Sequence, residues 1–295
     1  MRHVGLIGVG FIGKLFVDDL TEAGYPLTVH DIDESAVEYA TERGATAGGG
    51  PAAVAEAADV LLLALPGHPE VRSVLAEEGA VDALDAGDLV VDTTTVGPRA
   101  AEEFEALCAD RGVDYLAAPL TRAAPTPGVH LMVGGDEAVY ERAGEFLDDV
   151  STARTRIGDV YQAQSFKLMI QMRYAGQMAL DAEVVEFGRD RGVDPEVMNE
   201  FLGMDVDERY FSGDFSQGIE GLGGLRIWHK DLGYALDLSR ETNTALPLTS
   251  EVHEAYKDTL RNLDPDEGHA ATLIRHWMRL NGADDADRYG GEDGG

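Results

Sequence analysis

The stretch Val4-Gly-Leu-Ile-Gly8-Val-Gly10-Phe-Ile-Gly13 decides the fold that we expect of this chain of 295 residues. The apolar run at its start predicts a buried strand, and apolar residues at helical spacing beyond its end predict a helix. Three glycines at this spacing, between a strand and a helix, are typical of a loop that holds the pyrophosphate of a dinucleotide. The first glycine allows the tight turn, the second lets the phosphates approach the backbone, and the third lets the helix pack on the sheet.

An acidic residue after the second expected strand supports this interpretation. Leu27–His30 is the strand, and Asp31 follows it directly. A carboxylate at this place accepts hydrogen bonds from the adenosine ribose and repels a 2′-phosphate, and the neighbours Ile32 and Asp33 offer no cation to bind one. The sequence therefore favours NAD over NADP. The alternative is a glycine-rich turn in an α/β protein of another kind, with Asp31 as a helix cap.

Apolar runs and helical patterns alternate through the first half of the chain, which predicts βαβ units and a parallel sheet. The further expected strands are Val60–Leu65, Leu89–Val91, Tyr115–Ala117 and Leu131–Val133. A helix should follow from Asp136 to Val150, with Asp136 as its cap. After residue 158 strand patterns nearly vanish and apolar residues recur at helical spacing.

We therefore expect an α/β fold in which a Rossmann-like domain precedes an all-helical domain. The predicted boundaries are residues 1–157 for the dinucleotide-binding domain, 158–281 for the helical domain, which begins with a long helix from Val160 to Arg191, and 282–295 for an acidic disordered tail.

The composition limits the classes of function. With 55 acidic residues and a formal net charge of −32, the chain would be repelled by nucleic acid and by anionic membranes. No apolar run is long enough to span a bilayer and no basic leader precedes the first strand, so we expect a cytoplasmic protein. Dispersed acidic residues, with arginine in place of lysine, resemble the proteins of salt-loving archaea.

Cysteine and histidine give no sign of a metal site. The one cysteine, Cys108, lies in a helical pattern and predicts a buried apolar side chain rather than a nucleophile. The histidines lack partners at metal-ligand spacing. Lysine is also rare, and its four positions are Lys14, Lys167, Lys230 and Lys257.

Six further segments follow the glycine loop in a specific order. They are Leu65-Pro66, Asp92-Thr-Thr-Thr95, Ala118-Pro119-Leu-Thr121, Met132-Val-Gly-Gly135, the segment from Gly158 to Gln171 that contains Lys167, and Lys230-Asp231-Leu232. In order and spacing they resemble the β-hydroxyacid dehydrogenase family, which includes 3-hydroxyisobutyrate dehydrogenase and tartronate semialdehyde reductase. The resemblance extends to about Asn281 and implies a fold like that of 6-phosphogluconate dehydrogenase.

The resemblance implies a set of cofactor-binding residues and a catalytic lysine. The cofactor-binding residues are Gly8, Val9, Gly10, Phe11, Ile12, Gly13, Asp31, Leu65, Pro66, Thr95 and Lys230. Lys167 is implied as the general acid and base, because an amine that is partly desolvated beside a nicotinamide can exchange a proton near neutral pH. A solvated helix lysine at Lys167 and an interhelical ion pair at Lys230 are the alternatives.

Two departures from the family pattern concern the substrate. Where the family's substrate loop continues Ser-Gly-Gly, this chain has Thr121, Arg122 and Ala123, which we expect to hold a carboxylate. Arg122 either clamps that carboxylate with two hydrogen bonds or turns outward and leaves the backbone amides to bind it. Gln171 stands where the family has asparagine, on the same helix face as Lys167, and is expected to orient the substrate.

The expected activity is the reversible NAD-linked oxidation of a small 3-hydroxy acid to its semialdehyde. The alternatives are a reductase of another small carbonyl or imine, which Lys167 argues against, and a dinucleotide-binding module without turnover. The helical half carries wide apolar stripes, so we expect a homodimer or homotetramer.

Overall fold

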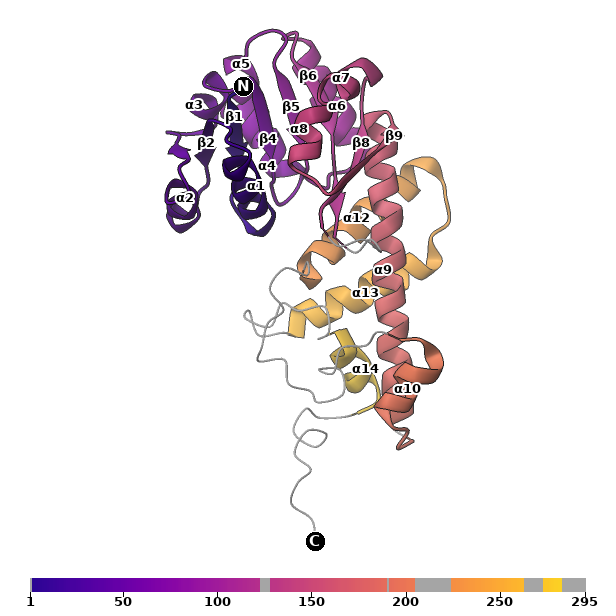
Figure 1. Ribbon diagram of the computed structural model, residues 1–295. Coiled ribbons are helices and arrows are strands. Elements are labelled where there is room, and N and C mark those ends of the chain that lie inside the picture. The colour runs from indigo at the N-terminus through magenta and orange to yellow at the C-terminus, as the bar shows by residue number, and fades with distance from the viewer. Residues whose placement is uncertain (1, 123–127, 190, 205–223, 263–272, 283–295) are drawn as a thin grey trace. The chain divides into compact units, whose positions relative to one another are not determined.

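A nine-stranded sheet lies at the centre of the first part of the chain (Figure 1). The computed structural model describes residues 2–122, 128–189, 191–204, 224–262 and 273–282. It divides into two compact units, Met1–Lys167 and Leu168–Gly295, and the boundary falls within the long helix α9 (Val160–Arg189).

The first strands of the sheet are parallel and run in the order β3-β2-β1-β4-β5-β6. They are β1 (Val4–Ile7), β2 (Leu27–His30), β3 (Thr46–Ala47), β4 (Val60–Leu63), β5 (Leu89–Asp92) and β6 (Asp114–Ala117). The chain leaves β1 on one side toward β2 and returns on the other side as β4. A ligand crevice is expected at such a reversal, outside the carboxyl ends of the strands.

Three more strands extend the sheet beyond β6. They are β7 (Leu120–Thr121), β8 (His130–Gly134) and β9 (Ala153–Gly158). β8 lies antiparallel to both β6 and β7 and parallel to β9.

Helices cover both faces of the sheet, as a buried parallel sheet requires. The helices of this unit are α1 (Phe11–Glu22), α2 (Glu34–Thr41), α3 (Pro51–Glu56), α4 (His68–Arg72), the π-helical turn η1 (Ser73–Glu77), α5 (Ala80–Ala83), α6 (Pro98–Ala109), α7 (Glu137–Arg142) and α8 (Gly144–Asp149). Helices α1, α2, α7 and α8 pack on the face that contains Leu6 and Leu62. Helices α3, α4, α5 and α6 pack on the face that contains Leu61 and Leu63.

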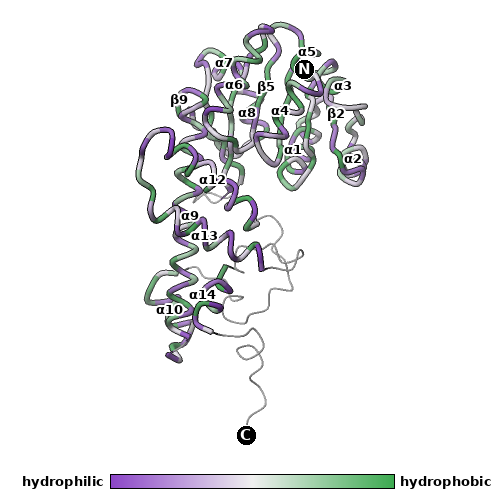
Figure 2. Tube along the Cα trace, turned by 180° about the vertical axis from the view of Figure 1, so that it is seen from behind, coloured by the Kyte–Doolittle hydropathy of each residue, from purple (hydrophilic) through white to green (hydrophobic). Residues whose placement is uncertain are grey.

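The second unit is helical throughout its described residues. It contains most of α9 together with α10 (Pro195–Leu202), α12 (Leu225–Thr242), α13 (Pro247–Asn262) and α14 (Ile274–Leu280). Small side chains on α9, including Ala175 and Ala179, pack with Leu232 of α12 and Tyr256 of α13. Figure 2 shows hydrophobic and hydrophilic residues alternating along α13, as expected of a helix with one buried stripe.

The predicted strands are all present, with ends that differ by a residue or two. The strands β3, β7 and β9 were not predicted, because two are only two residues long and the third is largely exposed. The prediction of a single helix from Asp136 to Val150 is wrong, since the segment forms α7 and α8 with a break at Ala143. Asp136 is the predicted cap and accepts hydrogen bonds from two backbone amides of α7. The predicted tail beyond Gly282 lies outside the described residues.

Two glycines at the end of β8 allow close packing, one against the start of α9 and the other against β6. A Cβ on Gly134, at the end of β8, would lie 2.2 Å from the carbonyl oxygen of Asp159 and 2.6 Å from the Cβ of Ala163. Gly135 has φ +138°, and its Cβ would lie 2.7 Å from Leu116. The Gly-Gly pair of the Met132–Gly135 segment is therefore required by packing.

Cys108 is confirmed as a buried side chain. Its exposed fraction is 0%. Burial, with a smaller contribution from Asp92, raises the pKa of the thiol to about 12, so it stays protonated at ordinary pH. Among the described helices, none is both long and apolar enough to cross a membrane.

Candidate active site

The glycine turn after β1 leaves one open position. Gly8 has φ +93°, and a Cβ there would lie 2.3 Å from the carbonyl oxygen of Ala64. A Cβ on Gly13 would lie 2.0 Å from the carbonyl oxygen of Gly8. A Cβ on Gly10 would meet no protein atom within 4 Å. Packing explains Gly8 and Gly13, whereas the space at Gly10 fits the close approach of a pyrophosphate.

Helix α1 begins at this open position. Gly10 is its N-cap and supplies no side-chain hydrogen bond. The amides of a helix's first turn have no partner within the helix and carry a partial positive charge, so those of Phe11, Ile12 and Gly13 suit an anion. Gly10 and Phe11 are exposed, which leaves this end of α1 accessible.

Asp31 lies against the glycine turn. Its Oδ2 accepts a hydrogen bond from the backbone amide of Val9 at 2.6 Å, and its Oδ1 accepts one from Asp33 at 2.9 Å. Each carboxylate oxygen can accept a further bond. Asp31 therefore stabilises the turn and can still accept further hydrogen bonds beside it. The next residue, Ile32, is 98% exposed.

The loops after β4 and β5 are tied together beside the turn. Leu65 donates its backbone amide to Thr94 Oγ1 at 3.1 Å. Thr93 donates its hydroxyl to the carbonyl oxygen of Leu63 at 2.6 Å. These bonds hold Leu65-Pro66 and Thr95 at the carboxyl ends of adjacent strands, with Pro66 exposed and Thr95 half-buried.

A buried carboxylate supports the second of these loops. Asp92 is 0% exposed and accepts hydrogen bonds from the Thr94 amide and from the Tyr115 hydroxyl, both at 2.9 Å. Burial raises the pKa of Tyr115 well above its usual value, and the charge of Asp92 raises it further. Tyr115 therefore remains a hydrogen-bond donor that fixes Asp92, and Asp92 fixes the loop that contains Thr95.

Helix α9 is attached to the same loop by a residue that sequence reasoning missed. Gln164 is 0% exposed. Its Nε2 donates to the carbonyl oxygen of Thr94 at 2.9 Å, and its Oε1 accepts from the amide of Val96 at 3.2 Å. Lys167 follows three residues later on the same face of α9 and is 7% exposed. The only signal in the sequence was a glutamine one turn before this lysine.

The predicted substrate loop is described in part. Thr121 ends β7 and Arg122 is exposed, whereas Ala123 lies outside the described residues. The Arg122 guanidinium carbon is 5.1 Å from the centre of the Phe11 ring, so this side chain reaches the first turn of α1. Arg122 also lines a pocket of about 270 Å³ together with Asp19 and Asp149. Its part in binding a substrate stays a prediction.

In the second unit, Gln171 and Lys230 share one partner. Gln171 donates from Nε2 to Oδ2 of Asp231 at 2.5 Å, which joins α9 to α12. Lys230 Nζ lies 3.1 Å from Oδ1 of the same carboxylate. Asp231 is 0% exposed and Gln171 is 6% exposed.

Two sequence families match this chain in succession. Residues 3–158 match the family described as the NAD binding domain of 6-phosphogluconate dehydrogenase. Residues 162–276 match the family described as NAD-binding of NADP-dependent 3-hydroxyisobutyrate dehydrogenase. The chain belongs to the β-hydroxyacid dehydrogenase family.

Individual relatives match over nearly the whole chain. The 2-(hydroxymethyl)glutarate dehydrogenase of Eubacterium barkeri is 28% identical over 293 residues, which cover 95% of this chain and 96% of the relative. The 2-hydroxy-3-oxopropionate reductase of Escherichia coli is 28% identical over 92% of this chain and 95% of its own. The structure of Mycobacterium tuberculosis 3-hydroxyisobutyrate dehydrogenase with L-serine has a TM-score of 0.80 at 23% identity, covers 94% of this chain and 99% of its own, and shows the shared fold.

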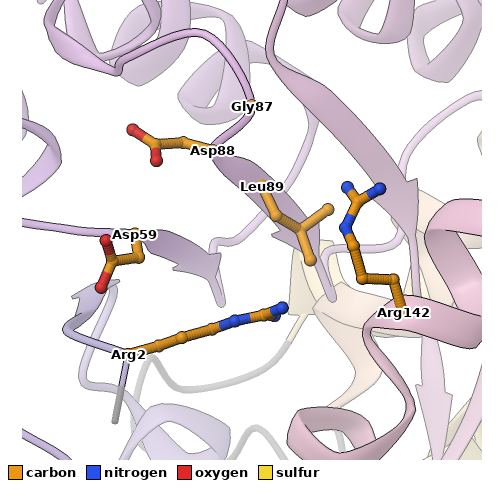
Figure 3. A pocket seen from close by; sticks show the side chains of 6 residues that line it. All are labelled: Arg2, Asp59, Gly87, Asp88, Leu89 and Arg142. Carbon is orange, nitrogen blue, oxygen red and sulfur yellow. The ribbon is translucent and has the colours of Figure 1, made fainter.

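A separate pocket of about 320 Å³ lies at the other edge of the sheet of this β-hydroxyacid dehydrogenase (Figure 3). It is lined by Arg2, Asp59, Gly87, Asp88, Leu89 and Arg142. Most of these residues come just before or at the start of β1, β4 and β5, so the pocket lies at the amino ends of the strands. The glycine turn follows the carboxyl end of β1, which makes the carboxyl edge the candidate active site.

Replacing Gly10 by alanine should separate cofactor binding from folding. The added Cβ meets no protein atom within 4 Å and the backbone has φ −68°, so the unfolding midpoint should stay unchanged. The methyl group fills the space for the pyrophosphate, and the dissociation constant for NAD should rise at least about tenfold. Fluorescence titration and chemical denaturation measure the two quantities.

Gly13→Ala is the matched control in the same turn. Its Cβ would lie 2.0 Å from a backbone oxygen, so it should lower the free energy of unfolding by about 1–3 kcal/mol. If Gly10→Ala bound NAD as tightly as the unaltered protein, the turn would not hold the pyrophosphate.

Proposed function

We propose that this β-hydroxyacid dehydrogenase catalyses the reversible NAD-linked oxidation of a small 3-hydroxy acid, such as 3-hydroxyisobutyrate, to its semialdehyde. One observation carries the proposal. The loop that contains Thr95, beside the open turn at Gly10, is hydrogen-bonded to Gln164, and Gln164 lies one helical turn before the buried Lys167.

Residues at the carboxyl edge of the sheet fit a dinucleotide. The amides of the first turn of α1 follow the open position at Gly10, Asp31 is hydrogen-bonded to the turn, and the Leu65 amide is hydrogen-bonded to the loop after β5. We assign the residues of the turn and Asp31, Leu65, Pro66, Thr95 and Lys230 to cofactor binding. The nicotinamide, when bound, supplies the hydride acceptor or donor. The protein has to bind and orient the reactants, exclude water and move one proton.

Lys167 is the residue that we assign to the proton. In the oxidation direction Nζ of Lys167 removes the proton of the substrate hydroxyl while the carbon that bears this hydroxyl gives up a hydride. In the reduction direction Nζ returns the proton to the same oxygen. Burial to 7% exposure limits the competing hydrogen bonds from water. The attachment of α9 through Gln164 limits movement of the backbone on which Lys167 is carried.

The substrate class follows from two relatives and from residues of this chain. 2-(Hydroxymethyl)glutarate and 3-hydroxyisobutyrate, which two of the relatives are named for, both have a hydroxymethyl group on the carbon next to a carboxylate. We assign the carboxylate to the segment Thr121–Ala123, including Arg122, and the orientation of the reacting group to Gln171. A guanidinium group offers paired donors for such a carboxylate.

The proposed activity is tested by turnover with NAD in molar salt, which suits the acidic composition. We expect 3-hydroxyisobutyrate, glycerate or 3-hydroxypropionate to be oxidised faster than 4-hydroxybutyrate, whose hydroxyl is one carbon farther from the carboxylate. Lys167→Ala should lower kcat at least about 100-fold with NAD binding intact, because it removes the general base.

Lys257→Ala is the matched control, since Lys257 is exposed and pairs with Glu254 at 2.9 Å. Its turnover should equal that of the unaltered protein. An unchanged kcat in Lys167→Ala would refute the role of the lysine. Binding of NAD without oxidation of any of the acids would favour a dinucleotide-binding module.

Asp31 should make the enzyme prefer NAD to NADP. A 2′-phosphate beside this carboxylate would be repelled, so kcat/KM for NAD should exceed that for NADP at least about tenfold. Asp31→Asn keeps an acceptor for the Val9 amide and removes the charge, so the ratio should fall toward one. If the unaltered protein used NADP as well as NAD, Asp31 would not contact the ribose.

The exposed apolar side chains of α9 and α10 favour a homodimer or homotetramer. Leu180 and Phe187 on α9 are 54% and 62% exposed, and Phe201 on α10 is 78% exposed. A second copy presents the same surface and can bury it symmetrically. Light scattering in molar salt should give at least twice the mass of 31.6 kDa, and a monomer would contradict the assignment.

A further inference from the structure

Two histidines face one another between α12 and α13 of the second unit. The rings of His229 and His253 are stacked, with their centres 4.2 Å apart and their planes 16° apart. The side chain of His253 is only 17% exposed. Nε2 of His229 is buried and has no hydrogen-bond partner among the described residues. Neutral rings suit this arrangement, because a neutral imidazole carries a proton on only one of its nitrogens.

Protonation is unfavourable for either ring of this His229–His253 pair. A charged His229 would carry a proton on Nε2, where no group in the described part of the chain accepts it. A charge on one ring would also repel a charge on the other across 4.2 Å. Burial lowers the pKa of both imidazoles, and the neighbouring ring lowers that of His229 further. The packed helices therefore favour two neutral rings.

The other charges that act on the pair come from the same two helices. Lys257 of α13 and Arg240 of α12 oppose protonation, whereas Glu254 of α13 and Asp237 of α12 favour it. Glu254 lies 3.8 Å from Nδ1 of His253 but is paired with Lys257 at 2.9 Å. The exposed carboxylate is thus largely neutralised by the lysine, and burial remains the largest influence on both rings.

We infer that the His229–His253 pair is an acid-sensitive contact, which holds α12 against α13 while both rings are neutral and is lost when either takes up a proton. Helix α12 also carries Lys230 and Asp231, and Asp231 joins it to Gln171 of α9. The pair therefore makes the support of this segment depend on pH. This regulation goes beyond the proposed function, and its test requires no turnover.

The pH range follows from the direction of the two shifts. In the unfolded chain both histidines have a pKa of about 6.5, and in the folded protein both pKa values are lower. Above about pH 6.5 the rings are neutral in either state, so the stability that the contact contributes is complete. Below that pH the unfolded chain takes up protons first, and the contribution is lost as the pH falls toward the folded pKa values.

Tryptophan fluorescence measures the unfolding of this unit selectively. The chain has two tryptophans, Trp228 and Trp277, and both lie in the second unit. Denaturant titrations of the full chain in molar salt, at about pH 7.5 and about pH 5.5, give the unfolding constant on either side of the transition. His253→Phe keeps a ring that can stack and cannot be protonated. The acid-induced rise in the unfolding constant should be at least about fivefold smaller in this variant than in the unaltered protein, and likewise in His229→Phe.

His276→Phe is the matched control in the same unit. Nδ1 of His276 lies 2.9 Å from a carboxylate oxygen of Asp258, so its protonation leaves no donor at that nitrogen unpaired. The acid-induced rise should be at least as large in this variant as in the unaltered protein. If His253→Phe and His229→Phe both kept the full rise, the inference would be overturned.

A second measurement uses the unaltered protein and so does not depend on the folding of the variants. The NMR shifts of the imidazole ring protons, followed through an acid titration, give the pKa of each histidine. Both His229 and His253 should titrate below the ordinary value of about 6.5. A pKa at or above that value for either ring would also overturn the inference.

Discussion

The buried amide of Gln164 is the contact on which the arrangement of the candidate active site depends. It satisfies a carbonyl oxygen at Thr94 and an amide at Val96, both buried, and leaving either without a partner would cost about 1–3 kcal/mol. The bare backbone of Gly134 lets the first turn of α9 approach β8 closely enough for this contact. The loop that contains Thr95 and the helix that carries Lys167 are thereby parts of one packed structure.

The same edge of the sheet explains how so acidic a chain could hold an anionic dinucleotide. The net charge is −32, and the four lysines leave few ammonium groups for phosphates. The amides of the first turn of α1 supply a positive potential that needs no side-chain cation. Asp31 contributes to this arrangement because it accepts a hydrogen bond from the Val9 amide and so fixes the turn. Its carboxylate lies where a ribose is expected. The high net charge is thus compatible with local anion binding.

Local patterns in the sequence predicted the strands, the glycine turn and the long helix, because each depends on residues that are close in the chain. The Asp136 cap was predictable for the same reason, whereas the break between α7 and α8 was not. Gly144 lies at that break, and a Cβ there would meet the guanidinium of Arg154 at 2.9 Å, which is a tertiary contact. The structure also brings Asp31, Leu65 and Thr94 to the carboxyl edge of the sheet.

The contacts that were missed join residues far apart in the chain. Gln164 and Thr94 are 70 residues apart, and Gln171 and Asp231 are 60 residues apart. Glutamine at either place fits a helix without regard to its partner, so neither contact leaves a periodic signal. Asp231 was visible as part of Lys230-Asp231-Leu232, but its bond to Gln171 became apparent only from the packing of α12 on α9.

Hydride transfer from the carbon that bears the substrate hydroxyl is the central claim, and isotopic labelling tests it most directly. The protein is mixed with NAD and 3-hydroxyisobutyrate deuterated at that carbon, and the reduced cofactor is analysed by mass spectrometry. The account predicts reduced cofactor that carries deuterium from the substrate, and none from heavy water when the substrate is unlabelled. Reduced cofactor without the substrate's deuterium, or bound NAD that is never reduced by any 3-hydroxy acid, would contradict it.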